Sequence, residues 1–402
     1  MVNLDTERAG TSLSKRLGKR QWWYPYRLWN AEFVKKMETG ISISFDDPPN
    51  SKFYRSGSIV KGTVKLNHSG SPRLSIKLRC DSSVRRKDFH QIWHRLLDLD
   101  MQIEKSTSPP LDYWNHTVPF SFVLPGSHEG CSHDVDSTQI QKLHSCLPPT
   151  ISHLDKEARR AMFPAGVEIE YIIVAEVWSY GRTRMEIGRP FNVLPALVEH
   201  SLLIPNMVDD TKMTATQQLK SKFFTGNSGH INLSVNPPTT LVLPVGSGSL
   251  PPIDITGFFC LEFSKGKPAL PQSCIFSAKF ESQTWSQTAP MQELPDIQEV
   301  KNCHSVSEVL ERNAEMNLVW ERNASEETNT VASSSVQNFT AQIKALIPAF
   351  SSSERVFPPT FYSCLIARTY RLHITIIIAS VPLRLVLPLQ LYIKNEGSSG
   401  KC

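Results

Sequence analysis

The chain has 402 residues, of which 40% are hydrophobic, so it is long enough for two domains of roughly 100 to 200 residues with separate cores. Its formal charge of +5, from 43 basic and 38 acidic residues, is more balanced than that of a dedicated nucleic-acid binder. None of the eight cysteines forms a Cys-x-x-Cys pair, which is typical of reduced cytosolic thiols and not of a disulfide framework.

The first 40 residues are basic and aromatic, and they lack the continuous apolar run of a signal peptide. This extension either docks onto the first predicted sandwich or rests on an anionic membrane, because Trp and Tyr favour the headgroup zone and basic residues add attraction. No amphipathic period is visible, which favours docking. The residues predicted for membrane contact are Lys15, Arg16, Lys19, Arg20, Trp22, Trp23 and Trp29.

From Ile41 onward, short segments of alternating apolar and polar residues are separated by Gly, Pro, Asn and Ser. Successive side chains of a strand point to opposite faces, so this pattern predicts strands with one buried face. A series of such strands is typical of an all-β sandwich. The first series covers 41–45, 60–66, 74–80, 120–124, 167–177 and 191–193.

A linker is expected at 196–222, where the alternation is lost. A second series of strands follows at 231–235, 241–243, 253–257, 275–280 and 370–378. Within it, Ser305 and Glu308 form a capping box that predicts one short helix, and the polar stretch 324–338 predicts a loop.

The most apolar segment, 370–393, is long enough for a membrane span, but Arg371, His373 and Pro382 favour two buried strands instead. The sequence therefore predicts an all-β chain of two tandem immunoglobulin-like antiparallel β-sandwiches, with a short helix and a polar loop inserted in the second. The expected parts are the extension 1–40, the first sandwich 41–195, the linker 196–222, the second sandwich 223–393 with a polar insertion near 282–345, and a short tail 394–402.

Several residues at the strand edges resemble the arrestin family, specifically its fungal alpha-arrestin branch. In the first half these are Tyr54, Gly57, Val60 and Gly62, then Pro119-Phe120-Ser121-Phe122 with Leu124-Pro125, Leu147-Pro148-Pro149-Thr150, Ile169, Tyr171, Pro190-Phe191 and Pro195. In the second half they are Pro358, Thr360, Phe361, the segment 370–378 and Leu387-Pro388-Leu389. Each motif alone is ordinary, and their order and spacing carry the resemblance.

The resemblance implies arrestin-like N-terminal and C-terminal domains and a cytoplasmic adaptor recruited to the plasma membrane or endosomes. Such an adaptor binds cytosolic tails of membrane transporters or receptors and promotes their ubiquitin-linked endocytosis. Alpha-arrestins generally recruit a HECT-type ubiquitin ligase through Pro-Pro-x-Tyr, and these 402 residues contain no such motif. The nearest approaches, 109–113 and 358–361, have the wrong spacing or lack the tyrosine. A sorting or signalling scaffold that acts without a ligase is the alternative.

The polar faces of two consecutive expected strands carry only cations, Lys61 and Lys65 on one, and Lys77 and Arg79 on the next. If these strands pair as a hairpin, four cations share one surface that would attract acidic or phosphorylated tails. Alternatively, the cations only keep a sandwich face soluble. The residues predicted to bind cargo are Lys61, Lys65, Lys77, Arg79, Arg85, Arg86 and Lys87.

His and Cys residues gather between positions 128 and 146, but their spacing matches no closed zinc module, so no metal or other cofactor is predicted. The residues in question are His128, Cys131, His133, His144 and Cys146. No nucleophile elbow, phosphate-binding Gly loop or His-Glu-x-x-His motif occurs, so the chain is expected not to be an enzyme. Glu168, Glu170 and Glu176 are expected on the solvent face of a strand.

Overall fold

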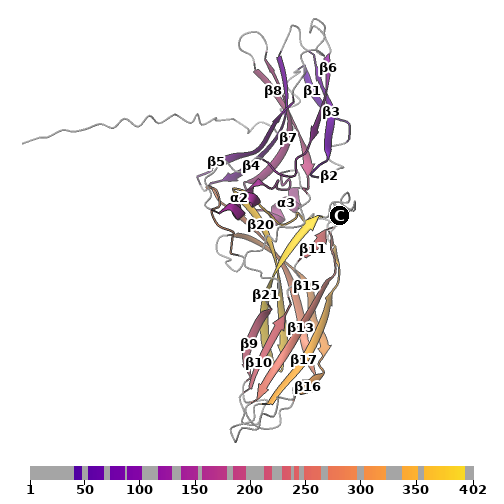
Figure 1. The fold of residues 1–402 in the computed structure, drawn as a ribbon, viewed down its shortest axis with the longest axis vertical. Helices are drawn as coiled ribbons and strands as arrows, with labels where there is room; N and C mark the ends of the chain where they lie inside the picture. The colour runs from indigo at the N-terminus through magenta and orange to yellow at the C-terminus, as the bar shows by residue number, and fades with distance from the viewer. Residues whose placement is uncertain are drawn as a thin grey trace, which may run out of the picture. The chain divides into compact units, whose positions relative to one another are not determined.

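The computed structural model describes most of the chain from residue 40 onward, and residues Ile41–Cys402 form one compact unit. The described residues are 40–47, 53–67, 73–86, 88–101, 116–128, 137–152, 156–178, 184–195, 212–219, 229–236, 240–243, 249–263, 270–296, 303–322, 337–351 and 357–393. The predicted all-β sandwich architecture is confirmed, since most of these residues lie in antiparallel sheets (Figure 1). The division into two domains stays a prediction.

Residues 41–195, here called the first half, form a three-stranded and a five-stranded sheet. The three-stranded sheet contains, in spatial order, β1 (Ile41–Phe45), β3 (Ile59–Leu66) and β6 (His116–Val123). The five-stranded sheet contains β2 (Phe53–Tyr54), β8 (Arg184–Val193), β7 (Val167–Trp178), β4 (Arg73–Arg85) and β5 (Gln91–Asp100). All neighbours are antiparallel except β2 and β8.

The inward residues of these two sheets form one hydrophobic cluster, as the alternation of the sequence predicts. Its aromatic centre is Tyr171, whose ring lies 6.0 Å from that of Phe191, which in turn lies 5.4 Å from Tyr54. The Tyr171 hydroxyl donates to the carbonyl of Pro148 at 2.7 Å, so its one polar atom is satisfied inside the core.

Residues 212–393, here called the second half, form a five-stranded and a six-stranded sheet around a second hydrophobic cluster. The five-stranded sheet contains β16 (Trp320–Arg322), β17 (Gln337–Ile347), β13 (Ile253–Phe263), β10 (Gly229–Val235) and β9 (Met213–Leu219). The six-stranded sheet contains β11 (Thr240–Leu243), β21 (Val381–Ile393), β20 (Ile366–Ile378), β14 (Ser273–Ser286) and β15 (Cys303–Asn317), with β19 (Phe361–Tyr362) beside β20. A separate pair is formed by β12 (Ser249–Leu250) and β18 (Phe350–Ser351).

The structure corrects the helix predicted from the capping box at Ser305, because β15 pairs with β14 along its length. Val309 and Val319, two of the apolar residues that follow the capping box, are 44% and 76% exposed. A capping box is a local signal, and here the long pairing with β14 overrides it. The expected polar insertion near 282–345 is therefore largely sheet, although most of the predicted loop at 324–338 lies outside the described residues.

The predicted linker is also partly wrong, since β9 pairs with β10 along seven residues, from Met213 opposite Val235 to Leu219 opposite Gly229. The Thr and Gln residues of β9 give the segment little hydrophobic alternation, which is common for an edge strand with a polar face, so the sequence did not predict this strand. The rest of the linker and the tail 394–402 lie outside the described residues.

Two buried strands at 370–393 are confirmed, since β20 and β21 cover this segment and pair antiparallel. No helix among the described residues is long and apolar enough to cross a membrane. The two helices of the described residues are short and lie in the first half: α2 (Thr138–Ser145), capped by the Ser137 hydroxyl, and α3 (Lys156–Met162).

The first hydrophobic cluster also includes four residues from far along the chain: Phe361, Cys364, Leu365 and Ile366. Close by, Arg368 is fully buried and donates to the carbonyl of Met162 at 2.7 Å, at the end of α3. Its guanidinium lies 4.5 Å from the ring centre of Phe163. A segment of the second half thus completes the core of the first.

Candidate functional site

The predicted basic hairpin is wrong, because its two strands belong to different sheets. β3, with Lys61 and Lys65, pairs with β1 and β6, whereas β4, with Lys77 and Arg79, pairs with β5 and β7. Sequence proximity favoured a hairpin, but the chain instead crosses from one layer of the sandwich to the other between these strands. The four cations therefore do not share a surface.

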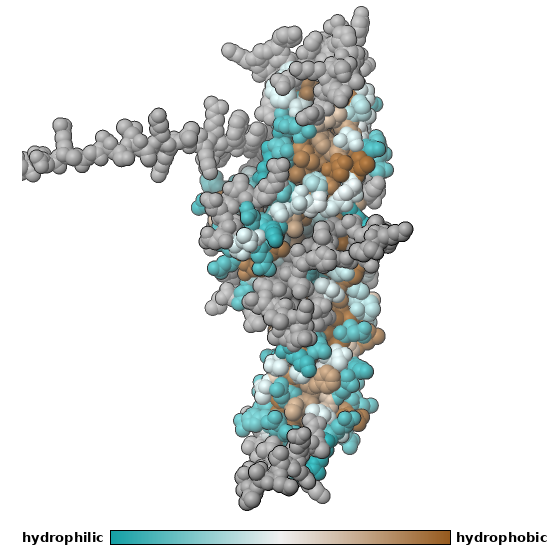
Figure 2. Space-filling model, viewed as in Figure 1, coloured by the Kyte–Doolittle hydropathy of each residue, from teal (hydrophilic) through white to brown (hydrophobic). Residues whose placement is uncertain are grey.

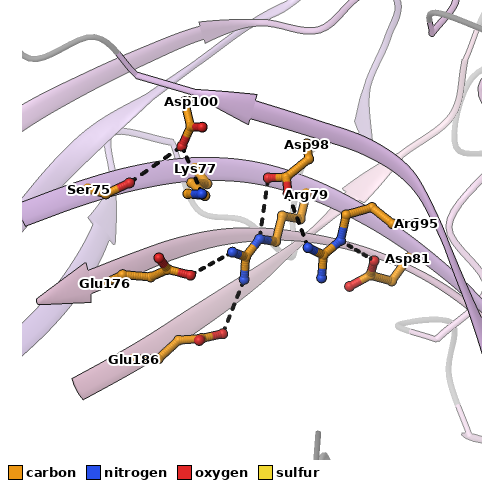
Figure 3. A network of polar contacts seen from close by, with 9 residues as sticks. All are labelled: Ser75, Lys77, Arg79, Asp81, Arg95, Asp98, Asp100, Glu176 and Glu186. Carbon is orange, nitrogen blue, oxygen red and sulfur yellow. Dashed lines mark hydrogen bonds and ion pairs between the residues drawn. The ribbon is translucent and has the colours of Figure 1, made fainter. Parts of the chain in front are cut away.

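Arg79 lies at the centre of an ion-pair network on the outer face of the five-stranded sheet (Figure 3). Its guanidinium lies 2.6 Å from Glu176 on β7, 3.2 Å from Glu186 on β8 and 3.4 Å from Asp98 on β5. The Arg79 side chain is only 5% exposed. Burial alone would lower the pKa of Arg79, but the hydrogen bond to Glu176 and the nearby Asp98 outweigh it and raise the pKa.

Glu176 was expected on the solvent face and is instead 2% exposed. It does point away from the core, as the alternation predicts, but neighbouring groups cover it. Position on a strand fixes the direction of a side chain and not its burial, which depends on what lies beside it. Arg79 stabilises this buried carboxylate as its ion-pair partner.

The network carries an excess of negative charge and does not provide a basic surface. The side chains drawn in Figure 3 include three cations and five carboxylates: Lys77, Arg79 and Arg95, against Asp81, Asp98, Asp100, Glu176 and Glu186. Lys77 lies 3.1 Å from Asp100, and Arg95 lies 2.9 Å from Asp81. An acidic tail would be repelled by this face, so we assign Lys77 and Arg79 a structural role.

Of the other predicted cargo-binding residues, Arg85 and Arg86 are exposed near the end of β4, and Lys87 lies outside the described residues. Arg86 lies 3.5 Å from Asp88 in an exposed ion pair, which contributes little to stability. The main chain of Arg85 donates to the carbonyl of Gly166 at 3.0 Å, which places it beside the turn after α3.

Lys61 and Lys65 are exposed cations, as the sequence predicts. Both are exposed on the outer face of the three-stranded sheet, and no ion pair between described residues involves either one. The strands β1, β3 and β6 contain no Asp or Glu, so their own residues do not neutralise these two lysines. Asp46 and Asp47 directly follow β1, and the main-chain N–H of Asp46 donates to the carbonyl of Lys61 at 3.1 Å.

Lys61, but not Lys65, lines a groove of about 830 Å³ between β6 and the end of β5. Six of its lining residues are apolar: Leu99, Met101, Pro119, Phe120, Phe122 and Val123. The polar lining includes Lys61, Thr63 and Ser121, together with the carboxylates of Asp46 and Asp100. The charged lining of the groove is Lys61 together with Asp46 and Asp100, of which Asp100 pairs with Lys77. A groove with mostly apolar walls and a few charged groups at its rim is suited to a peptide or another amphipathic ligand.

A second buried polar network, on β14, β15 and β20, was not found from the sequence. Glu281 accepts from Arg371 at 2.9 Å and contacts His373 and Ser305. Burial opposes ionisation of Glu281, but the hydrogen bonds from Arg371 and Ser305 outweigh it and lower its pKa. Burial, together with repulsion from Arg371 and Lys279, lowers the pKa of His373 although Glu281 raises it.

The remaining predicted sites give no assembled centre. The proposed membrane-contact residues, from Lys15 to Trp29, lie outside the described residues, as do Cys131 and His133. The ring of His128 hydrogen-bonds the main-chain oxygen of His144 at 2.6 Å, so it contributes to local structure. Among the residues that the structure describes, no group of three or more His, Cys, Asp or Glu is arranged to hold a metal.

No protein-family model matches this sequence, and no curated protein matches it. The arrestin resemblance therefore stays a prediction, and the functional argument depends on the residues themselves.

Proposed function

We propose that this chain is a non-enzymatic, arrestin-like cytoplasmic adaptor that binds acidic segments in the cytosolic tails of membrane transporters or receptors. Bound to its cargo at the plasma membrane or endosomes, it promotes ubiquitin-linked endocytosis and trafficking. The proposal is supported by the arrestin-like order of the strand-edge motifs and by the all-β sandwich architecture. A broad sheet face presents side chains at fixed spacing, which suits recognition of an extended peptide.

The observation that carries the proposal is the pair of exposed cations, Lys61 and Lys65, on a sheet whose strands contain no acidic residue. They lie four residues apart on one strand, so both point to the same face, about 13 Å from each other along β3. Acidic or phosphorylated side chains at similar spacing on a tail would meet both, and the attraction acts over roughly 8 Å at physiological salt.

Proximity labelling in the native cell tests this proposal, with charge reversal of Lys61→Glu and Lys65→Glu in one variant. We expect membrane transporters or receptors among the neighbours of the wild-type chain and their loss in the double variant. Lys142→Glu with Lys344→Glu, two exposed lysines on α2 and β17, is the control that changes the net charge by the same amount. An unchanged set of membrane neighbours in the double variant would remove the basis of the proposal.

A second candidate is an arrestin-fold sorting or signalling scaffold that acts without a ubiquitin ligase. It is favoured by one observation, namely that no Pro-Pro-x-Tyr motif occurs in these 402 residues. WW domains bind such a motif through a polyproline turn followed by an aromatic residue at fixed spacing. Pull-down with isolated WW domains of HECT-type ligases separates the two candidates, because recruitment through WW domains predicts retention and the scaffold predicts none.

A further inference from the structure

The strand β6 is an edge strand of its sheet among the described residues. Its hydrogen bonds show which of its main-chain groups face β3 and which face the open edge. Just beyond β6, the Leu124 N–H donates to Ser58 at 2.9 Å, and the Leu124 carbonyl accepts from Gly57 at 2.8 Å. Both main-chain groups of Leu124 thus point toward the β3 side. Because this direction alternates along a strand, those of Ser121 and Val123 point to the open edge.

The main-chain nitrogen of Pro119 faces the open edge, like those of Ser121 and Val123. Its missing N–H therefore removes a donor from that edge and not from the pairing with β3. A proline on an edge is a common device against uncontrolled strand addition. Pro119 lacks an N–H but keeps its outward carbonyl, and Thr117 faces the same edge. Beyond Pro119, Ser121 and Val123 each present both an N–H and a carbonyl to the open edge, which is enough to pair with a short peptide.

The opposite edge of the same sheet is less accessible. There, the Arg189 guanidinium on β8 donates to the carbonyl of Ile43 on β1 at 2.5 Å and lies 5.6 Å from the ring centre of Phe45. Arg189 therefore engages the β1 edge with a side chain from the other layer of the sandwich. The β6 edge is the better candidate for strand addition in this sheet.

The two faces of an added strand would meet different surfaces. Its inward side chains would enter the groove between β6 and β5, against Phe122, Leu99 and Met101, which favours apolar residues. Its outward side chains would lie next to Ser121 and Val123. Val123 is 60% exposed, and its partner Ile59 across the strand pair is 48% exposed. Figure 2 shows apolar surface in the region that carries β1, β3 and β6 in Figure 1.

Charge selects the remaining position. Lys61 lies directly opposite Ser121 in the register of β3 and β6. A strand added beside β6 would lie roughly 10 Å from β3, which is two strand spacings. Because the Ser121 side chain between them is small, the long Lys61 side chain can extend over it toward that added strand. An acidic residue at that position of the peptide would pair with Lys61.

We propose that β6 accepts an extended peptide as an additional strand, and that the peptide alternates apolar residues, which enter the groove, with at least one acidic residue beside Ser121. The inference rests on the proposed adaptor function for the source of the peptide, a cytosolic tail. It adds to that function the binding site, the main-chain mode of recognition and the pattern of the bound sequence.

Ser121→Pro in the full-length chain is the decisive variant, because it removes one outward N–H and leaves every bond to β3 in place. Pro119, two residues earlier, indicates that this strand tolerates proline at such a position. Ser121→Ala, which keeps the N–H, is the matched control. The probe is a fluorescein-labelled, end-blocked peptide of four Val-Asp repeats, measured by fluorescence anisotropy. We expect Ser121→Pro to weaken binding about tenfold or more and Ser121→Ala to change it less than about twofold.

The peptide provides a second test that does not depend on the folding of a variant. Methylating alternate backbone nitrogens removes the peptide's own donors, and we expect the same loss of binding to the wild-type chain. A Val-Lys repeat of equal length should bind more weakly than Val-Asp, and Lys61→Glu should reduce that difference. Equal binding of the methylated peptide, or no effect of Ser121→Pro, would overturn the proposal.

Two other occupants of the edge would also overturn it. If a segment of this chain covers β6, the Ser121 and Val123 amides will already be protected from hydrogen exchange in the free monomer. If a second copy covers it, sedimentation will show a dimer that Ser121→Pro dissociates. We expect a monomer whose two amides exchange quickly and become protected when the Val-Asp peptide is added.

The proximity-labelling result separates this inference from the proposed function. If the membrane neighbours depend on Lys61 and Lys65 but persist in Ser121→Pro, the adaptor function is supported and strand addition is refuted. If the peptide binds the β6 edge but the chain has no membrane neighbours, the adaptor function is refuted and the binding site is supported.

Discussion

Removal of Arg79 alone is expected to destabilise the chain more than removal of Arg79 together with Glu176. The two side chains are 5% and 2% exposed and lie 2.6 Å apart, so each offsets the buried charge of the other. Arg79→Met leaves Glu176 buried without its partner, which costs about 3–5 kcal/mol. Arg79→Met with Glu176→Leu replaces the pair by apolar groups of similar size, which is often neutral or stabilising. Glu186 and Asp98 also lose Arg79, but they are 20% and 34% exposed and remain partly hydrated. We therefore expect the double variant to be less stable than the wild type and clearly more stable than Arg79→Met.

A double-mutant cycle measured by urea unfolding at pH 7 gives the coupling energy, with tryptophan fluorescence as the signal. Lys77→Met is the matched control, because its partner Asp100 is 62% exposed and such a pair contributes about 0–1 kcal/mol. Added salt should weaken the Lys77 effect and leave the Arg79 effect nearly unchanged. A coupling energy below about 1 kcal/mol between Arg79 and Glu176 would refute the reasoning.

Three further perturbations test other parts of the fold. Gly62→Ala places a Cβ 2.1 Å from a backbone oxygen of β1 and should lower the free energy of unfolding in urea by about 1–3 kcal/mol. Gly126→Ala, whose added Cβ has nothing within 4 Å, is the control and should change that free energy by less than about 0.5 kcal/mol. Arg368→Ala removes the donors to a buried carbonyl and two hydroxyls and should cost about 2–5 kcal/mol; a smaller loss of thermal stability than about 1 kcal/mol would contradict its role. Burial lowers the folded-state pKa of His373 below 6.5, and hydrogen bonds that outweigh burial lower the pKa of Glu281 below 4.5, so the stability that each group contributes is present above that value and lost as pH falls. Urea midpoints should therefore decline from about pH 6.5 and again below about pH 4.5, and His373→Gln should remove the first decline.

Individual strands were predictable because burial in a sandwich has a period of two. The segments at 41–45, 60–66 and 167–177 alternate cleanly, and each is a strand whose inward residues lie in the core. The alternation failed at Met213–Leu219, whose polar sequence gains its place through pairing with β10. It also failed at Cys303–Asn317, where a local capping signal competed with a long partner strand.

The pairing of the strands was not predictable, and the candidate site depended on it. Lys61 and Arg79 look equivalent in sequence, since each is a cation on the polar side of an alternating segment. One is exposed, and the other is buried among carboxylates from three strands. Two of these, Glu176 and Glu186, come from segments about 100 residues later, so only the sheet order distinguishes the two cations.

The contribution of Phe361, Cys364, Leu365 and Ile366 to the first hydrophobic cluster has a consequence for synthesis of the chain. On the ribosome, the strands of the first half emerge long before these four side chains. At roughly 5–20 residues per second, the stretch between Val193 and Ile366 takes about 9–35 s to translate. Throughout that interval the nascent chain exposes apolar surface that its own later residues will cover, which favours capture by chaperones or aggregation. An expressed fragment that ends at residue 195 would keep this surface uncovered permanently.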